Sequence, residues 1–176
     1  MIRIETFEDA KLSETLEITL KRLLDEAFEG DFSEEDWNHS LNGTRFVGYM
    51  GDLVVAHGSV VKRKIWINEV EKLAGYIEAI AVLPSHWRLG IGSALMKEIS
   101  QYCLENFDYC LLSTDEKSFY RRFGWKDFEG SSFVLSGEEE VSTQSENEGL
   151  MYLLGVDVEI HSITKVVCEE RDGDAW

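Results

Sequence analysis

The segment between residues 78 and 107 constrains the fold of this chain more than any other part of the sequence. An apolar run at residues 80–82 is followed by Pro84, the single proline of the chain, and then by a loop that contains Gly90 and Gly92. Apolar residues next recur at helical spacing, at Leu95, Met96, Ile99, Cys103 and Leu104. The pattern predicts a buried strand, a short loop and an amphipathic helix over residues 93–107.

The predicted loop is a candidate anion site. Where a loop enters a helix, unpaired backbone N–H groups and the positive end of the helix dipole meet, and glycine leaves the backbone open to a ligand. A glycine pair also occurs in ordinary strand–helix turns, so the pair does not identify a ligand by itself. The sequence G-x-x-x-x-G-K-[ST] of nucleotide hydrolases is absent, and so are the third glycine and the ribose-binding acid of dinucleotide folds.

Length and composition predict one soluble domain over residues 1–176. A chain of this length with 44% hydrophobic residues can bury a sizeable core. No apolar stretch reaches membrane-spanning length and the first residues do not form a secretory signal, so we expect no membrane partner. Three cysteines without a C-x-x-C motif predict free thiols, no metal and a cytoplasmic location, and the four histidines are isolated from one another.

The charge of the chain restricts its partners. Its 34 acidic and 17 basic residues give a formal net charge of −17, which argues against nucleic acid because phosphate contacts need clustered Lys and Arg. Most acidic proteins simply have a well-solvated surface. The acids of this chain are clustered, however, and a cleft lined by several of them would attract a polycation. The clusters comprise Asp31, Glu34, Glu35, Asp36, Glu138, Glu139, Glu140, Glu146, Glu148, Glu169, Glu170, Asp172 and Asp174.

The other predicted elements follow from hydrophobic periodicity and turn residues. We expect helices at residues 13–28 and 34–41, a hairpin of residues 45–50 and 53–64, and strands at 72–82, 109–113, 128–135 and 150–156. Residues 136–149 are almost entirely polar, which predicts a long loop. The tail, residues 157–176, is acidic but retains an apolar cluster around Val166 and Val167.

The glycine loop resembles the acyl-coenzyme A pyrophosphate loop, Q/R-x-x-G-x-G/A, of the GCN5-related N-acetyltransferase (GNAT) superfamily. The first position of that pattern falls on Trp87, with Arg88 one place later. The next superfamily features follow in order: a strand at residues 109–113, and the pattern Phe-Tyr-x-x-x-Gly-Trp at residues 119–125. The resemblance implies an α/β (α+β) fold, with a mixed, mostly antiparallel central sheet whose central strands splay apart and are flanked by helices.

A second resemblance covers the chain from end to end. Residues 26–37, with the sequence EAFEGDFSEEDW, residues 75–82, with GYIEAIAV, and residues 168–176, with CEERDGDAW, resemble the aminoglycoside 2′-N-acetyltransferases. The glycine loop is closer to the general superfamily pattern than to that family's own, and the segment between Ser113 and Tyr120 is two residues shorter. The resemblance implies an enzyme that uses acetyl-CoA as cosubstrate and acts on a polycationic aminoglycoside in antibiotic resistance.

The resemblance also implies site residues. Main-chain groups of Ile80 and Val82 would pair with the pantetheine arm like an added strand, and one N–H group would polarise the thioester carbonyl. The coenzyme pyrophosphate would lie on Trp87, Arg88, Leu89, Gly90, Ile91, Gly92 and Ser93. Acceptor contacts would come from Asp31, Asp36, Glu78, Ser113, Glu148, Asp174 and Trp176, including the terminal carboxylate.

Acetyl transfer needs a neutral amine, whereas amines near neutral pH are mostly protonated. A general base is therefore required, and Glu78 is the candidate, acting directly or through water. Tyr120 is the candidate acid for the departing thiolate. Two structural alternatives stay open: Glu78 pairing with a Lys or Arg across the sheet, and Tyr120 serving as a core residue.

The sequence is compatible with three functions. The first is aminoglycoside 2′-N-acetylation. The second is acetylation of another cationic amine, such as a polyamine, a cell-wall amino sugar or a protein amine. The third is non-catalytic acyl-CoA binding, which the presence of both Glu78 and Tyr120 disfavours. The oligomeric state stays open, with a homodimer as one option.

Overall fold

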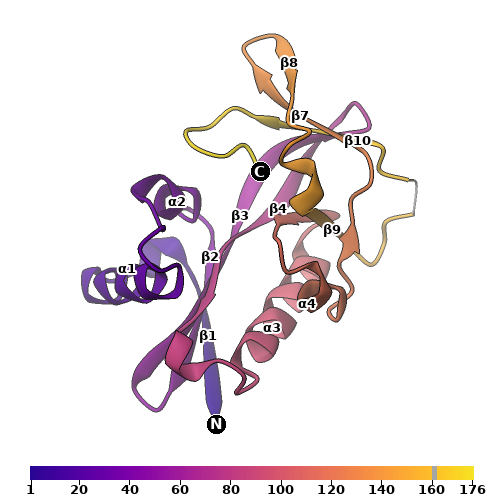
Figure 1. The fold of residues 1–176 in the computed structure, drawn as a ribbon. Helices are drawn as coiled ribbons and strands as arrows, with labels where there is room; N and C mark the ends of the chain where they lie inside the picture. The colour runs from indigo at the N-terminus through magenta and orange to yellow at the C-terminus, as the bar shows by residue number, and fades with distance from the viewer. Residues whose placement is uncertain (160–161) are drawn as a thin grey trace. The chain divides into compact units, whose positions relative to one another are not determined.

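The computed structural model describes residues 1–159 and 162–176, and it divides the chain into two compact units. Unit 1 comprises residues 1–61 and 77–99, and unit 2 comprises residues 62–76 and 100–176. Three elements contribute residues to both units: strand β3 (Leu53–Ile67), strand β4 (Val70–Val82) and helix α3 (Ile91–Asn106). Figure 1 shows these elements along the chain.

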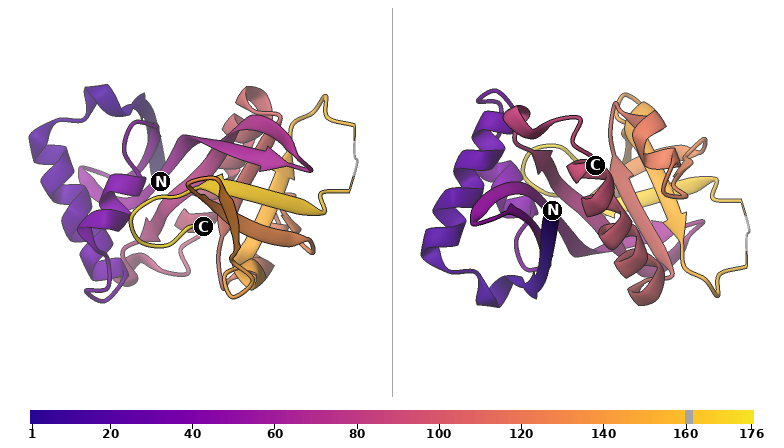
Figure 2. Two further views of the ribbon diagram at one scale, coloured as in Figure 1. Left: turned by 90° about the horizontal axis from the view of Figure 1, so that it is seen from above. Right: turned by 90° about the horizontal axis from the view of Figure 1, so that it is seen from below.

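Unit 1 is built on the strand order β1-β2-β3-β4. Strands β1 (Ile2–Glu8) and β2 (Thr44–Met50) are antiparallel, and β2 is antiparallel to β3 with a register shift between Gly48 and Tyr49. Helices α1 (Glu14–Ala27) and α2 (Glu34–His39) lie beside these strands (Figure 2). Their shared core consists of Leu20, Leu23, Leu24, Trp37, Val47, Val54 and Ala81.

The two helices begin where the sequence predicts. The Ser13 hydroxyl accepts a hydrogen bond from the Leu16 backbone N–H at 3.3 Å, which satisfies one of the unpaired donors at the start of α1. Helix α2 starts with a capping box, in which the Ser33 hydroxyl and the Asp36 carboxylate each accept from the other residue's backbone N–H. A short 3₁₀ turn, η1 (Asp9–Lys11), connects β1 to α1.

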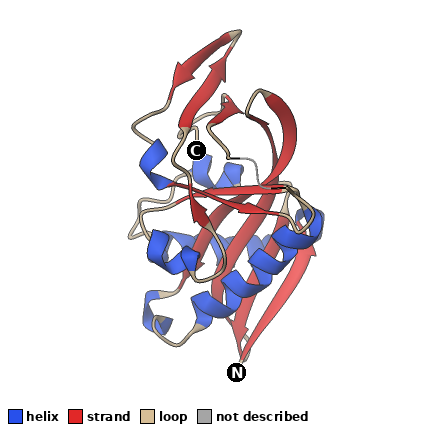
Figure 3. Ribbon diagram, turned by 90° about the vertical axis from the view of Figure 1, so that its right-hand side faces the viewer, coloured by secondary structure: helices blue, strands red, loops and turns tan. Residues whose placement is uncertain are grey.

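Unit 2 is a mixed sheet with the strand order β6-β9-β5-β4-β3-β10-β7-β8. The strands are β5 (Tyr109–Ser113), β6 (Lys126–Asp127), β7 (Ser131–Ser136), β8 (Glu139–Ser142), β9 (Leu150–Leu154) and β10 (Lys165–Glu169). The pairs β4–β5 and β10–β7 are parallel, while the other registered pairs are antiparallel. Helix α4 (Lys117–Arg121), labelled in Figure 1, and the 3₁₀ turn η3 (Asn147–Gly149) complete the unit. Figure 3 distinguishes the helices and strands of the chain by colour.

The two central strands of the sheet pair over a short stretch. The parallel register of β4 and β5 covers Gly75 with Cys110 and Tyr76 with Leu111, although β4 continues to Val82. A short pairing of this kind is what splayed central strands require. The mixed α/β fold expected from the sequence is therefore confirmed.

The prediction of a long loop at residues 136–149 is wrong, because these residues contain strand β8 and turn η3. The apolar cluster of the tail, for which the sequence predicts no element, is strand β10, which pairs with both β3 and β7. Strand β8 is exposed along its whole length and has one apolar residue, so it lacks the alternation that identifies a half-buried strand. Within the described residues, no helix is both long and apolar enough to cross a membrane.

Candidate active site

The predicted coenzyme loop lies in unit 1, between β4 and α3. After the 3₁₀ turn η2 (Pro84–His86), the backbone adopts left-handed conformations at Arg88, with φ of 63°, and at Gly90, with φ of 79°. A Cβ atom added at Gly90 would meet no atom within 4 Å. The bond from the Ala94 N–H to the Gly90 carbonyl, 3.0 Å, then starts the helix. An open glycine before a helix N-terminus fits the approach of a phosphate group to the backbone.

Trp87 connects this loop to the end of β4. Its side chain is 55% exposed, and its indole N–H donates to the Val82 carbonyl oxygen at 2.8 Å. Val82, predicted to pair with the pantetheine arm, therefore already has one acceptor position in use. This hydrogen bond places the Trp87 ring beside the end of the strand.

The strand β4 contains an irregularity at the predicted base. Ala79 has a φ of 53°, a left-handed conformation that residues with a Cβ rarely adopt inside a strand. Glu78, Ala79 and Ile80 are all half-buried, so the usual alternation of faces is interrupted here. The Ile80 side chain packs over Gly58, where an added Cβ would lie 2.5 Å from the Ile80 Cδ1 atom.

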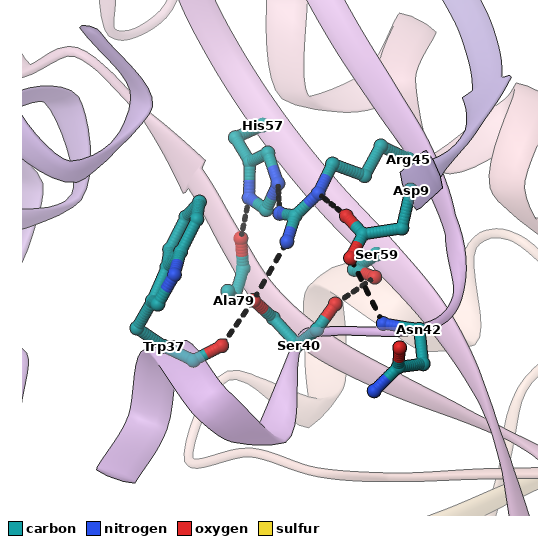
Figure 4. Close-up of polar contacts among 8 residues, drawn as sticks. All are labelled: Asp9, Trp37, Ser40, Asn42, Arg45, His57, Ser59 and Ala79. Atoms are coloured by element: carbon teal, nitrogen blue, oxygen red, sulfur yellow. Dashed lines mark hydrogen bonds and ion pairs between the residues drawn. The ribbon is translucent and has the colours of Figure 1, made fainter. Parts of the chain in front are cut away.

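A buried cluster lies behind this irregularity. His57 and Arg45 are completely buried, and the His57 ring contacts the Ala79 carbonyl oxygen through Nδ1 at 2.8 Å (Figure 4). Burial, together with the positive charge of Arg45, lowers the pKa of His57 to about 3. The ring is therefore neutral at neutral pH. None of these residues forms a recognisable motif in the sequence, because each lies alone on a different element.

This lowered pKa predicts a pH-dependent stability. Between pH 6.5 and about 3 the unfolded chain binds a proton at His57 that the folded chain does not, so the free energy of unfolding should fall as the pH falls. The slope due to this residue is at most about 1.4 kcal/mol per pH unit. Urea denaturation of the wild type and of His57→Gln at pH 7, 6 and 5 would measure it. Equal slopes for the two proteins would contradict the prediction.

The predicted acid, Tyr120, lies in unit 2 on α4. Its side chain is buried, and burial raises the pKa of its phenol to about 12. The Phe119 ring meets it edge to face, with ring centroids 5.1 Å apart. A phenol with this pKa keeps its proton at neutral pH and is a weaker acid than an exposed tyrosine.

Besides Glu78, two of the predicted acceptor residues lie in unit 1. Asp31 is exposed in the loop before α2. Asp36 is half-buried, and its Oδ2 atom accepts from both the Ser33 N–H at 2.9 Å and the Ser33 hydroxyl at 2.8 Å. One oxygen of the Asp36 carboxylate is therefore occupied by the helix cap.

Four predicted acceptor residues lie in unit 2, and the structure brings some of them together. Ser113 is exposed at the end of β5, beside η3: an added Cβ at Gly149 would lie 2.6 Å from the Ser113 Oγ atom. Glu148 belongs to the same turn and is exposed. Asp174 is also exposed, on the tail that ends at the buried Trp176.

The tail is fixed to unit 2 by its last two residues. The Trp176 indole N–H donates to the Thr143 hydroxyl at 2.9 Å, and its backbone N–H donates to the Glu146 carboxylate at 3.1 Å. The Arg63 guanidinium donates to the Ala175 carbonyl at 2.9 Å and lies over the Trp176 ring, 5.8 Å from its centroid. The sequence does not indicate these three partners, because they are ordinary polar residues far away in the chain.

Metal binding has no candidate among the described residues. In residues 1–159 and 162–176, no group of three or more His, Cys, Asp or Glu side chains is arranged to hold a metal ion. Cys103, Cys110 and Cys168 are buried and free.

Comparison with known proteins identifies the family. The model of the acetyltransferase (GNAT) family matches residues 10–125. An aminoglycoside 2′-N-acetyltransferase of Mycolicibacterium fortuitum is 33% identical over 162 residues, which cover 89% of this chain and 83% of that protein.

Solved structures agree on the fold. Escherichia coli ElaA aligns with a TM-score of 0.61 at 16% identity, over 86% of this chain and 99% of that one. A probable N-acyltransferase from Enterococcus faecalis V583 aligns with a TM-score of 0.60 at 16% identity; 73% of this chain corresponds to only 33% of that longer protein. A GNAT family acetyltransferase from Brucella melitensis, in complex with acetyl-CoA, aligns with a TM-score of 0.54 at 22% identity, over 70% of this chain and 83% of that one. The chain described here therefore belongs to the GNAT family of acetyltransferases.

Proposed function

We propose that this protein transfers the acetyl group of acetyl-CoA to the 2′-amino group of an aminoglycoside. The observation that carries the proposal is the 33% identity to the aminoglycoside 2′-N-acetyltransferase of M. fortuitum across 89% of the chain. The GNAT family assignment supports the acetyl transfer, and the relative supports the acceptor class.

The charge of the protein supports a polycationic acceptor. The net charge is −17, and Asp31, Glu148 and Asp174 are exposed carboxylates at positions where the resemblance expects acceptor contacts. Each ammonium group of an aminoglycoside can form charge-assisted hydrogen bonds to such carboxylates. At physiological ionic strength the Debye screening length is about 8 Å, so added salt weakens the attraction between these carboxylates and the ammonium groups. Acceptor binding should therefore weaken as salt is added.

The chemistry requires two proton transfers. In the proposed reaction, Glu78 removes a proton from the acceptor ammonium, directly or through water, so that the nitrogen lone pair can attack the thioester carbonyl. A C–N bond forms and the C–S bond breaks. Tyr120, which is protonated at neutral pH, then supplies the proton to the departing thiolate and regains one from solvent. The Ile80 N–H is the proposed donor to the carbonyl oxygen.

A second candidate, acetylation of another cationic amine, is favoured by one observation. The Asp36 carboxylate is partly occupied by the α2 capping box, so one of the expected aminoglycoside contacts has reduced acceptor capacity. Antibiotic resistance as the biological role is part of the first proposal only.

Release of free coenzyme A, measured against a panel of amines, tests the proposal. Gentamicin- or tobramycin-like compounds, which carry a 2′-amine, should be acetylated, whereas kanamycin-like compounds with a 2′-hydroxyl should not. Equal turnover of both classes would refute the 2′ assignment. Turnover of polyamines alone would favour the second candidate, and acetyl-CoA binding without any turnover would favour a non-catalytic role.

Asp174 offers a sharper test of the acceptor site. Asp174→Asn removes one charge from the exposed tail, and the loss of one charge-assisted hydrogen bond, about 1.5–3 kcal/mol, should raise the aminoglycoside KM by about tenfold or more. The KM for acetyl-CoA should stay unchanged. Asp172→Asn is the matched control, since it removes the same charge from an equally exposed position two residues away. If both variants raise the KM equally, the effect is general electrostatics and Asp174 is not a contact.

A further inference from the structure

We infer that His57 is a positioning residue: it holds the left-handed turn of β4 at Ala79 and so orients Glu78 and Ile80, the two neighbours that the proposed reaction uses. This inference rests on the proposed function and adds to it residues that contact neither substrate. The residues that carry it, Asp9, Arg45, His57 and Ala79, all lie within unit 1.

The chemistry of the contacts fixes the tautomer of His57. Its Nε2 atom lies 2.7 Å from the Arg45 Nη1 atom, and its Nδ1 atom lies 2.8 Å from the Ala79 carbonyl oxygen. A guanidinium group can only donate hydrogen bonds, so Nε2 must accept. The single ring proton is therefore on Nδ1, where it is donated to Ala79. A charged imidazolium ring could not accept from Arg45, and the contact would be lost.

Arg45 is itself rigidly held. Its Nε atom contacts the Asp9 carboxylate, its guanidinium lies 4.5 Å from the centroid of the Trp37 ring, and a longer contact of 3.4 Å reaches the Ser40 hydroxyl. Asp9 in turn accepts from the Asn42 backbone N–H at 3.0 Å. The chain of contacts runs from Asp9 through Arg45 and His57 to the Ala79 carbonyl, and Figure 4 shows it continuous.

A cluster of this kind costs more to bury than apolar side chains of the same volume. A fully buried Arg and His lose their hydration, and replacing such a group by hydrophobic residues is often neutral or stabilising in other proteins. Stability alone is therefore a weak reason for the cluster. The position of the cluster supplies a better reason. Its last hydrogen bond is made to the carbonyl of Ala79, the one residue of β4 with a left-handed backbone.

The strain explains why support is needed at this carbonyl. A left-handed residue in a strand rotates the peptide groups on either side, and so sets the directions of the Glu78 side chain and of the Ile80 N–H. Without the Nδ1–H donor, the Ala79 carbonyl would be half-buried and lack this partner, and β4 would relax toward a regular strand. Glu78 and Ile80 would then turn away from their present directions.

The main experiment compares His57→Leu with His57→Gln. Leucine fills the volume without hydrogen bonds, so kcat should fall by about 10- to 100-fold. The Kd of acetyl-CoA should rise by a smaller factor, because the contacts of the glycine loop are left intact and only those of Ile80 change. Glutamine carries both a donor and an acceptor and should restore at least a third of the wild-type kcat. Ser59→Ala is the matched control: Ser59 is equally buried, two residues along β3, and its hydroxyl donates to the Ser40 carbonyl at 2.8 Å. This control should lose stability but keep its kcat.

A double-mutant cycle keeps the inference testable if His57→Leu does not fold. Glycine adopts a φ of 53° without strain, so Ala79→Gly should recover part of the kcat that His57→Ala loses, alanine being too small to clash in the buried site. The inference is supported if the kcat of the double variant exceeds, by at least threefold, the value obtained by multiplying the two single effects. It is overturned if the kcat of the double variant equals that product. A folded His57→Leu that retains more than half of the wild-type kcat also overturns it.

Hydrogen exchange separates this inference from the proposed function. If the wild type acetylates no amine, the proposed function fails, but exchange of the amides of residues 78–80 can still be followed. His57→Leu should raise their exchange rates at least tenfold, and Ser59→Ala should not. Unchanged exchange in His57→Leu would overturn the positioning role whatever the acceptor is.

Discussion

Replacing Glu78 with glutamine is expected to lower the acetylation rate by about 10²–10⁴-fold, with acetyl-CoA binding unchanged. Glutamine keeps the shape of the side chain and removes its basicity, so the acceptor must lose its proton to bulk solvent. The residual rate should therefore rise with pH, as the fraction of neutral amine increases. Steady-state rates from pH 6 to 10 and calorimetric titration with acetyl-CoA would measure both quantities.

Glu71→Gln is the control for this variant. Glu71 is an exposed acid on the same strand, β4, and its replacement removes the same charge. Its rate should match that of the wild type. A Glu78→Gln enzyme that keeps more than half of the wild-type rate across the pH profile would show that the base lies elsewhere.

Gly92→Asp should weaken acetyl-CoA binding on the order of 100-fold or more. The substitution places a side chain and a negative charge in the first turn of α3, at the proposed pyrophosphate site. An acid in the first turn of a helix normally stabilises that helix, so the variant should stay folded and its loss of binding should not come from unfolding. Calorimetry would give the Kd, and thermal denaturation would check the fold.

Gln101→Asp provides a matched control, because it adds the same charge to an exposed position of α3, well after the first turn. We expect it to bind acetyl-CoA within about twofold of the wild type, since the added charge is screened by solvent. A folded Gly92→Asp protein with unchanged affinity would disprove the assignment of the loop.

Elements with a clear period were predictable from the sequence. Helix α3 and strand β5 have regular apolar patterns, and Ser13 and Ser33 are typical helix caps, so the bounds of these elements agree with the prediction to within about two residues. The sequence does not predict strand β8, because its side chains are all exposed, or strand β10, because its short apolar run of three residues lies within an acidic tail.

The candidate site was predictable only where it depends on local sequence. The glycine loop is contiguous, and its spacing can be read directly. The partners of Trp176, namely Arg63, Thr143 and Glu146, are separated from it by 30 to 113 residues, and nothing in their local sequence links them to it. His57 is an isolated histidine in the sequence, and its relation to Glu78 exists only because β3 and β4 are neighbours.

The cluster behind Ala79 has a consequence for the order of folding. Its contacts join residues that are 36, 12 and 22 positions apart in the chain, from Asp9 to Arg45, Arg45 to His57, and His57 to Ala79. Contacts between residues far apart in the chain form late in folding. Closing the loop between them costs conformational entropy, and the contact energy offsets that cost only once the loop is closed. The left-handed turn at Ala79 is held by the whole cluster only once strands β2, β3 and β4 and the turn η1, which carries Asp9, are in place. The geometry around Glu78 is thus a property of the finished fold and not of any single hairpin or helix within it.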